Sequence, residues 1–459
     1  GDNSMEMILE FLRDVLSQPA LLIGIMSCVG LIALKRPFHK IMTGTLKPIL
    51  GYLMLAAGAG VIVSNLDPLG KMIEHGFHIT GVVPNNEAIV AVAQKVLGVE
   101  TMSILVVGLL MNLLIARFTK FKYVFLTGHH SLFMACLMSA VLGTAGLSGI
   151  ELILVGGFLM GAWSAISPAI GQSYTSKVTD GDEIALGHFG SLGYYLSAWV
   201  AKYVGKAEES TEDIEIPEKW GFLRDSTLST ALTMIVFYLI AAIAAGSEFV
   251  ATLSGSMSPY LFAIMSAMNF AVGVAIVYSG VRMILGDLIP AFQGIATKII
   301  PNAIPAVDCA VFFTYAPTAV VLGFISSFIG GIIGMLILGA VGGVLIIPGL
   351  VPHFFCGATA GIYGNATGGR RGAAVGAFLN GLAITFLPAL ALPVLGQLGF
   401  QNTTFGDADF AVIGLVLGNA FEWIGMAGIY GVVVIAALVL IIPNFIKTKG
   451  KVINYVEEE

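Results

Sequence analysis

The chain has 459 residues, of which 57% are hydrophobic and 11% are charged, and its mean hydropathy is +0.92. A soluble globular domain carries about 25% charged residues, so this composition excludes a soluble enzyme and predicts an all-α polytopic membrane protein. The formal net charge of -6 says little about partners, because the acidic residues lie mainly in the N-terminal segment and the hydrophilic loops.

Apolar windows long enough to cross a bilayer recur along the chain, since about 20 such residues span a hydrocarbon core of roughly 30 Å. We predict eleven spans, at residues 19–34, 48–64, 101–116, 123–143, 150–170, 227–246, 260–281, 299–323, 330–350, 372–395 and 411–442. The last window is long enough to break near Gly425 or Gly428. Residues 1–4 resemble an expression remnant, so we treat residues 5–459 as one transmembrane unit.

Six clusters of basic residues fall on one side of this predicted topology. They are residues 35–47, residues 117–122, residues 202–224, Arg282 with Lys298, Arg370 with Arg371, and residues 447–451. Lysine and arginine are retained on the cytoplasmic side of a membrane. The pattern therefore predicts an odd number of spans, with the N-terminus outside and the C-terminus in the cytoplasm.

The sequence offers no motif for a cofactor or a metal. The four cysteines, Cys28, Cys136, Cys309 and Cys356, stand singly in apolar runs without CxxC spacing, so we interpret them as packing residues. There is no GxxxxGK[ST] motif for nucleotide hydrolysis, and we expect no nucleic-acid partner. Residues 202–225 form a charged stretch that is too short for a catalytic domain, and we predict a cytoplasmic connector there. Energy for transport must then come from another polypeptide or from an ion gradient.

Four ionisable residues lie inside or beside apolar windows, namely His129, His130, His188 and Asp308. An ionisable group at membrane depth costs about 2.5 kcal/mol or more, so it indicates the pathway of a polar substrate. We expect Asp308 to act as a proton acceptor and His129 and His188 to hold the solute, although Asp308 is also compatible with a structural carboxylate paired to an amide or a histidine. His130 is predicted to be a packing residue, and His353 fits either role.

Short patterns recur in the same order in the two halves of the chain. Residues 35–48 resemble 289–301, residues 84–90 resemble 316–321, and residues 127–130 resemble 351–353. We predict approximate repeats at residues 19–204 and 260–442, with about five spans each. An odd unit inserted twice faces opposite ways, which is the inverted repeat typical of transporters.

Glycine-rich polar segments at residues 187–193 and 352–369 interrupt the apolar pattern. We predict re-entrant hairpins there, because irregular backbone is tolerated at membrane depth only where it lines a protein-enclosed cavity. The alternative for each segment is an ordinary cytoplasmic loop.

Several longer motifs together resemble one family. They are FLTGHH at 125–130, KVTDG at 177–181, GH at 187–188, KAEESTEDIEIP at 206–217, GVRMILGDLIPAFQGIATKIIPNAIPAVDCA at 280–310 and YAPTAVVLGF at 315–324. From about Leu21 onward the chain resembles the membrane subunit, enzyme IIC, of the L-ascorbate phosphotransferase system, in the ascorbate/galactitol-type superfamily. The resemblance implies a homodimer in the bacterial inner membrane, with a V-shaped scaffold motif and a core domain that moves as an elevator. It also implies that a cysteine of a separate cytoplasmic IIB protein, recharged by IIA and ultimately by phosphoenolpyruvate, donates the phosphoryl group.

The resemblance also implies a substrate shell, with Asp308 in addition as the catalytic residue. It consists of Ala56, Gly58, Ala59, Asn86, Glu87, His129, Phe133, His188, Phe189, Asp308 and Ala310. This chain departs from the pattern of ascorbate carriers, which have glutamine or another polar group at four of these positions, here Ala56, Ala59, Phe133 and Phe189, and an aromatic residue in place of Glu87. Each lost hydrogen bond weakens binding by roughly 0.5–1.5 kcal/mol, and a charged Glu87 would repel an anion. The phenylalanines would instead stack on the apolar face of a sugar ring.

The function implied is a phosphotransferase-system permease for a hydroxyl-rich sugar acid, L-ascorbate or a relative of it. The residues alone also allow a proton- or sodium-coupled symporter that uses Glu87, Asp308 and the histidines as a relay, or a passive channel. Dependence of uptake on phosphoenolpyruvate and the soluble phosphotransferase proteins, rather than on an imposed ion gradient, separates the first function from the second.

Overall fold

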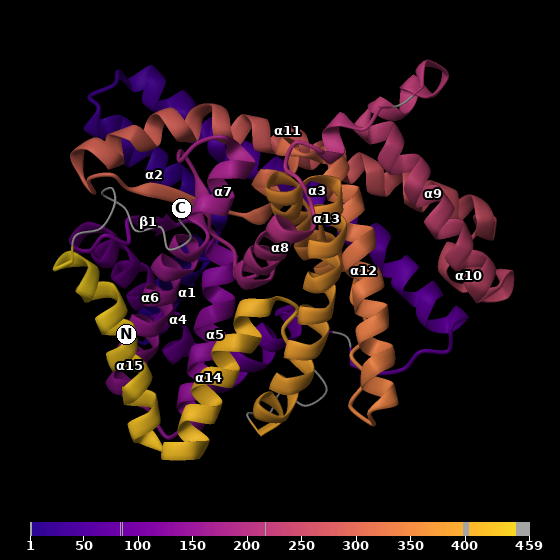
Figure 1. The fold of residues 1–459 in the computed structure, drawn as a ribbon. Coiled ribbons are helices and arrows are strands. Elements are labelled where there is room, and N and C mark those ends of the chain that lie inside the picture. The colour runs from indigo at the N-terminus through magenta and orange to yellow at the C-terminus, as the bar shows by residue number, and fades with distance from the viewer. Residues whose placement is uncertain (1, 83, 85, 216, 398–403, 447–459) are drawn as a thin grey trace.

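A computed structural model describes residues 2–82, 84, 86–215, 217–397 and 404–446, and it consists almost entirely of helices (Figure 1). The first half contains α1 (Asp2–Leu16), α2 (Pro19–Ala33), α3 (Phe38–Gly76), α4 (Asn86–Phe118), β1 (Tyr123–Phe125), α5 (Gly128–Thr144), α6 (Gly149–Ile170), α7 (Gln172–Thr179), β2 (Ala185–Leu186) and α8 (Ser191–Val204). The second half contains η1 (Thr211–Asp213), η2 (Glu218–Arg224), α9 (Ser226–Ala245), α10 (Ser247–Ser254), α11 (Pro259–Lys298), β3 (Ile304–Val307), η3 (Cys309–Tyr315), α12 (Pro317–Ala340), α13 (Leu350–Gln397), α14 (Ala408–Ile424), α15 (Met426–Ile441) and η4 (Ile442–Asn444).

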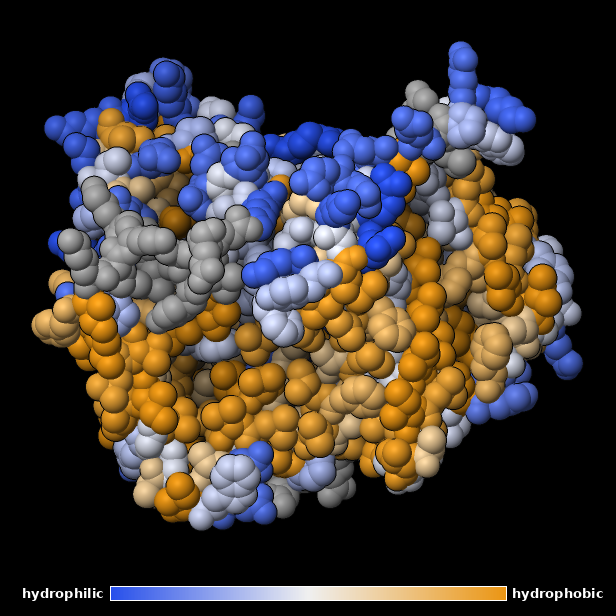
Figure 2. Space-filling model, in the orientation of Figure 1, coloured by the Kyte–Doolittle hydropathy of each residue, from blue (hydrophilic) through white to orange (hydrophobic). Residues whose placement is uncertain are grey.

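The all-helical membrane fold predicted from composition is confirmed. Within the described residues, eight helices are long and apolar enough to cross a membrane, or up to nine if α1 and α2, bent by 80°, are one span. Figure 2 shows the matching surface, a broad hydrophobic band below an edge where hydrophilic residues gather. The count is lower than eleven partly because the windows at 123–143 and 299–323 are not single helices: each contains a strand, β1 or β3.

Three short parallel strands form a buried sheet in the order β1-β3-β2. Phe125 pairs with Ala306, and Leu186 pairs with Val307. The strands satisfy one another's backbone groups, which is why extended backbone is tolerated at this depth inside the protein. Because the strands are parallel, the segments that follow them all leave the sheet at the same edge.

The long helices α3 and α11 pack closely along their length. A Cβ atom on Gly58 would lie 2.7 Å from the carbonyl oxygen of Gly273, and one on Gly51 would lie 2.9 Å from that of Gly280. The later residue of α3, Gly58, meets the earlier residue of α11, Gly273, so the two helices are antiparallel. Glycine is needed at such crossings, because only a residue without a side chain lets helix backbones approach this closely.

The predicted interruptions of the second half take different forms. The long terminal window does break at Gly425, where φ is +71°, between α14 and α15, which meet at the bottom of Figure 1. In α13 the break lies at Gly369, where φ is +67°, and a Cβ on Gly364 would lie 2.5 Å from the carbonyl oxygen of Gly372. Residues eight apart in a straight helix are about 12 Å apart, so the chain reverses at Gly369.

The two segments predicted to be re-entrant hairpins therefore differ from that expectation. Residues 352–369 form one arm of the α13 hairpin rather than a whole hairpin. Residues 187–193 form the turn between β2 and α8 together with the first residues of α8.

Candidate functional site

A cavity of about 1200 Å³ lies beside the sheet edge. Its walls come from α3, the start of α5, η3, the C-terminal part of α12 and residues 347–352. Seven polar residues gather in its lining around the sheet edge: Tyr52, Asn86, His129, His130, His188, Asp308 and Asp407. The remaining lining is largely apolar, which is typical of a pocket that orients a small molecule through a few polar groups.

The mouth of the cavity lies away from the basic segments. Asp67, Lys71 and Glu74 line it near the C-terminal end of α3, whereas the basic cluster 35–47 is at the N-terminal end of that helix. Helix α12 has the same orientation: its C-terminal half lines the cavity, whereas the backbone amide of Thr318 in its first turn donates a hydrogen bond of 2.7 Å to Glu212 in the charged connector.

The sheet explains why the site residues meet. β1 leads into His129 and His130, β2 leads into His188, and β3 leads directly into Asp308. Because the carboxyl ends of parallel strands lie at one edge, residues separated by up to about 180 positions in the sequence come together there.

Asp308 is buried, with 8% of its surface exposed, and it contacts groups from two elements. The hydroxyl of Tyr52, on α3, donates to Asp308 Oδ2 at 2.8 Å. The Nε2 atom of His129 lies 3.8 Å from the same oxygen. The carboxylate therefore links the long helix α3 to the sheet edge while still lining the cavity.

The hydrogen bonds of His188 define its tautomer. Its Nδ1 atom accepts a hydrogen bond from the backbone amide of Gly190 at 3.2 Å, and the hydroxyl of Tyr194 lies 2.9 Å from the same atom. A nitrogen that accepts a backbone N–H carries no proton, so the ring proton is on Nε2. His188 thus offers an N–H donor from its other nitrogen.

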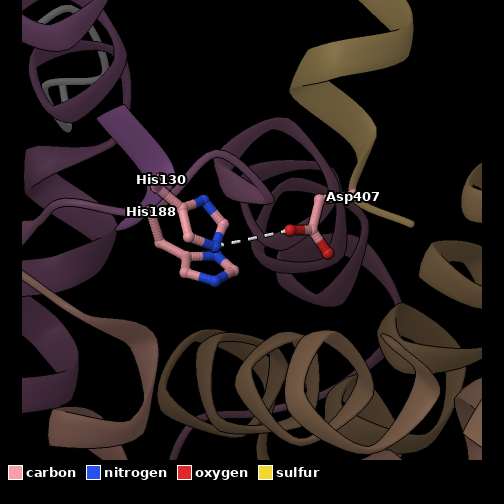
Figure 3. Close-up of side chains that lie close together, drawn as sticks. All are labelled: His130, His188 and Asp407. Atoms are coloured by element: carbon pink, nitrogen blue, oxygen red, sulfur yellow. Dashed lines mark ion pairs between the residues drawn. The ribbon is translucent and has the colours of Figure 1, made fainter. Parts of the chain in front are cut away.

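His130 is buried, as predicted for a packing residue, but it also lines the cavity beside Asp407 (Figure 3). Its Nδ1 accepts from the amide of Phe189 at 3.2 Å, and its Nε2 lies 3.6 Å from Asp407 Oδ2. Its ring centroid is 3.9 Å from that of His188. This second histidine–aspartate pair lies next to the first.

Asp407 is held by two further donors. The thiol of Cys356 donates to its Oδ1 at 2.9 Å, and the side-chain amide of Asn86 lies 3.4 Å from its Oδ2. Asn86 also accepts from the backbone of Gly406 at 2.8 Å. The hydrogen bond to Asp407 gives Cys356 a polar role, whereas the sequence analysis interpreted this cysteine only as a packing residue.

Among the residues that the structure describes, two groups of side chains are close enough to share a metal ion, namely His130, His188 and Asp407, and His188, Asp308 and Cys309. Both groups need His188, whose Nδ1 is occupied as an acceptor. A metal on Nε2 would require the proton on Nδ1, where it would face the N–H of Gly190. The hydrogen bonds therefore favour binding of a polar solute over coordination of a metal.

The cavity brings together eight of the residues proposed from the sequence: Ala56, Ala59, Asn86, His129, Phe133, His188, Asp308 and Ala310. Gly58 faces α11 instead, and Phe189 is fully buried against Phe125, with ring centroids 4.6 Å apart. Glu87 belongs to the first turn of α4, and its side chain lies outside the described part of the structure.

Sequence reasoning did not include Tyr52 or Asp407 among the site residues. Tyr52 precedes Ala56 by four residues, which places both on one face of α3, so its spacing was an available signal. Asp407 stands just ahead of the apolar helix α14, in FGDADF, where it resembles an ordinary helix-start residue. His353, which fitted two roles, is buried with its Nδ1 2.9 Å from the hydroxyl of Ser327 and is absent from the cavity lining.

Comparison with known proteins identifies the family of this chain. The chain is 26% identical over 417 residues to a protein of Mycoplasma pneumoniae (strain ATCC 29342 / M129 / Subtype 1) named "Ascorbate-specific PTS system EIIC component". That alignment covers 78% of this chain and 62% of the relative, so the chain spans less than two thirds of the relative's length. The model of the EIIC-GAT family, described as "PTS system sugar-specific permease component", matches residues 14–409. The chain therefore belongs to the sugar-specific permease family of the phosphotransferase system.

Proposed function

We propose that this chain is the membrane permease of a phosphotransferase system and binds a hydroxyl-rich solute in the cavity at the sheet edge. The observation that carries the proposal is the convergence of His129, His188 and Asp308 in one cavity of a chain that the permease family covers almost throughout. A hydroxyl both donates and accepts hydrogen bonds, so it matches a mixture of carboxylates and imidazoles.

Asp308 is the proposed proton acceptor for the phosphoryl transfer. The solute hydroxyl attacks the phosphorus of a cysteinyl phosphate on IIB, the sulfur–phosphorus bond breaks, and the hydroxyl proton passes to the carboxylate. A buried carboxylate within hydrogen-bond reach of the hydroxyl suits this role. Tyr52 orients the carboxylate through its hydrogen bond of 2.8 Å.

Transfer from a cytoplasmic protein requires a second arrangement of the molecule. The cavity lies away from the connector at residues 202–225, which we assign to the cytoplasm from the positive-inside rule, so we propose that this arrangement is an outward-open state in the bacterial inner membrane. We assign α2, α3, α9 and α11 to the scaffold of a homodimer and the sheet with α8, α12 and α13 to a moving core. Elevator movement of that core would carry the bound solute to the cytoplasmic side.

The name of the M. pneumoniae relative makes L-ascorbate, or a related sugar acid, the first solute to test. The side chains at the cavity nevertheless differ from the pattern of ascorbate carriers. Ala56, Ala59 and Phe133 line it, and none of them offers an amide.

Uptake into right-side-out membrane vesicles, or into proteoliposomes that enclose the soluble components, tests the function. We expect solute to accumulate in phosphorylated form only when phosphoenolpyruvate and the soluble phosphotransferase proteins, including IIB, are present. Accumulation of unmodified solute under an imposed proton or sodium gradient, without phosphoenolpyruvate, would contradict the proposal and support a symporter.

A further inference from the structure

We propose that Asp409 is a positioning residue for the solute site, because its carboxylate completes the N-terminus of α8 and thereby fixes the ring of His188. The inference rests on the proposed function in one respect, that His188 holds the solute. Asp409 is fully buried, and it is not among the described residues that line the cavity. It can therefore act on a solute only through residues that do line the cavity.

The side chain of Asp409 accepts hydrogen bonds from two other helices. Its Oδ1 accepts from the backbone amide of Leu192 at 3.0 Å. Its Oδ2 accepts from the hydroxyl of Ser191 at 2.6 Å and from Nε1 of Trp163, on α6, at 3.2 Å. The backbone amide of Asp409 donates to the carbonyl oxygen of Phe189 at 3.0 Å. The start of α14 is thus joined to the turn between β2 and α8.

The start of α8 explains why a carboxylate is needed at this place. A helix leaves its first N–H groups without acceptors of its own, and a buried N–H without an acceptor destabilises the fold. Here the ring Nδ1 of His188 accepts from the amide of Gly190 at 3.2 Å, and its carbonyl oxygen accepts from the amide of Ser191 at 3.2 Å. The next amide, that of Leu192, donates to Asp409. His188 and Asp409 therefore terminate the same helix together.

The turn itself cannot supply the missing acceptor. Its N-cap residue is Gly190, where a helix more often carries serine, threonine, aspartate or asparagine. A Cβ atom on Gly190 would collide with the hydroxyl of Tyr194 and would lie 3.1 Å from Nδ1 of His188. Glycine is therefore required here, and the cap comes from α14 instead. A carboxylate suits the position, because a helix N-terminus carries partial positive charge.

Loss of the carboxylate would change what His188 presents to the cavity. Without Asp409, the amide of Leu192 and the hydroxyl of Ser191 would lack their acceptor, and the turn would shift toward another one. The Nδ1 atom of His188 accepts from this same turn, so its acceptor role would no longer be fixed. The proton of a neutral imidazole that is not held by such a bond is shared between the two ring nitrogens. The donor on Nε2 would then be present in only part of the molecules.

Nuclear magnetic resonance of the purified chain in lipid nanodiscs, with isotope-labelled histidine, tests the inference without a solute. Nitrogen chemical shifts distinguish a protonated from an unprotonated ring nitrogen, and the spectrum of His188→Ala assigns the signals of His188. We expect an unprotonated Nδ1 in the wild type and a mixture of tautomers in Asp409→Ala. Wild-type signals of His188 in folded Asp409→Ala would overturn the inference.

The matched control removes a helix-capping aspartate at another place. Asp225 is exposed, and its carboxylate accepts from the amides of Thr227 and Leu228 at the start of α9, at 2.9 and 3.2 Å. We expect Asp225→Ala to leave the signals of His188 unchanged. The same change of tautomer in Asp225→Ala would overturn the inference, because it would show a general response to a lost cap.

A conservative variant keeps the test decisive if Asp409→Ala does not fold. Asp409→Asn retains an oxygen that accepts from Leu192, so we expect it to preserve the wild-type tautomer of His188. A changed tautomer in Asp409→Asn, or a protonated Nδ1 of His188 in the wild type, would overturn the inference.

Isothermal titration with L-ascorbate separates positioning from a merely structural role. We expect Asp409→Ala and His188→Ala each to weaken binding about threefold to tenfold, and the double variant to bind within about twofold of His188→Ala. Losses that multiply in the double variant would show that Asp409 acts independently of His188 and would overturn the inference. Absence of phosphoenolpyruvate-dependent uptake in the wild type would instead contradict the proposed function, and the tautomer comparison would still decide the role of Asp409.

Discussion

The α3–α11 pair and the three-stranded sheet both bury backbone inside a membrane protein, but they do so in different ways. The two helices satisfy their own hydrogen bonds, so glycines such as Gly58 and Gly273 bring them into close contact. The strands must pair with one another, and β2 is followed directly by Gly187 and β3 by Asp308 within the protein. Polar chemistry therefore concentrates where regular helix stops, while the helix pair provides the frame.

The largest expected effect comes from the sheet edge. Asp308→Asn keeps the size and polarity of the side chain but cannot accept a proton, so we expect phosphoenolpyruvate-dependent uptake to fall by about 100-fold or more. Gel filtration and thermal unfolding of the purified variant check that it is folded. Uptake near the wild-type rate would exclude Asp308 as the proton acceptor.

The matching test of the helix pair uses two glycines of α3. A Cβ on Gly58 would meet backbone atoms of α11 at 2.7 and 2.8 Å, whereas one on Gly60 meets nothing within 4 Å. We expect Gly58→Ala to lower the free energy of unfolding by about 1–3 kcal/mol. Gly60→Ala should be neutral or stabilise by up to about 1 kcal/mol. Equal melting temperatures for the two variants would show that the close packing is not needed.

The histidines of the sheet edge are expected to have intermediate effects. His129→Ala and His188→Ala each remove one hydrogen bond to the solute, so we expect the affinity to fall about threefold to tenfold. The exposed His39 provides the control, since His39→Ala makes the same change far from the cavity. A comparable loss in His39→Ala, measured by titration, would mean that the effect is not local.

The smallest expected effect separates two phenylalanines that the sequence treats alike. Phe133 lines the cavity, so Phe133→Gln should improve ascorbate binding severalfold by adding an amide. Phe189 is fully buried behind His130, so Phe189→Gln should instead destabilise the fold by about 1–3 kcal/mol and add no affinity. Improved binding in the Phe189 variant would indicate that its side chain does face the solute.

The contrast between long helices and short strands also explains which parts of the fold could be predicted from the sequence. Helices such as α6 and α9 were predictable because each carries a window of about 20 apolar residues, and the break at Gly425 was visible as glycine in an overlong window. His129, His188 and Asp308 stood out because ionisable groups are rare in apolar runs.

The sheet, and the site residues Tyr52 and Asp407 beside it, could not be predicted from local sequence patterns. Strands of two to four apolar residues look like parts of a helical window, so the windows starting at residues 123 and 299 were extended through them. Tyr52 is only weakly polar, and Asp407 resembles a helix-start residue. Their places depend on contacts across the fold, with Asp308 and His130, that no local pattern records.

A structure of the full chain in nanodiscs with a transported solute, determined by electron cryomicroscopy, tests the central claim most directly. We predict solute density at the sheet edge, with oxygen atoms within hydrogen-bond distance of the Asp308 carboxylate and His188 Nε2. Density elsewhere, with this cavity filled only by water, would contradict the account.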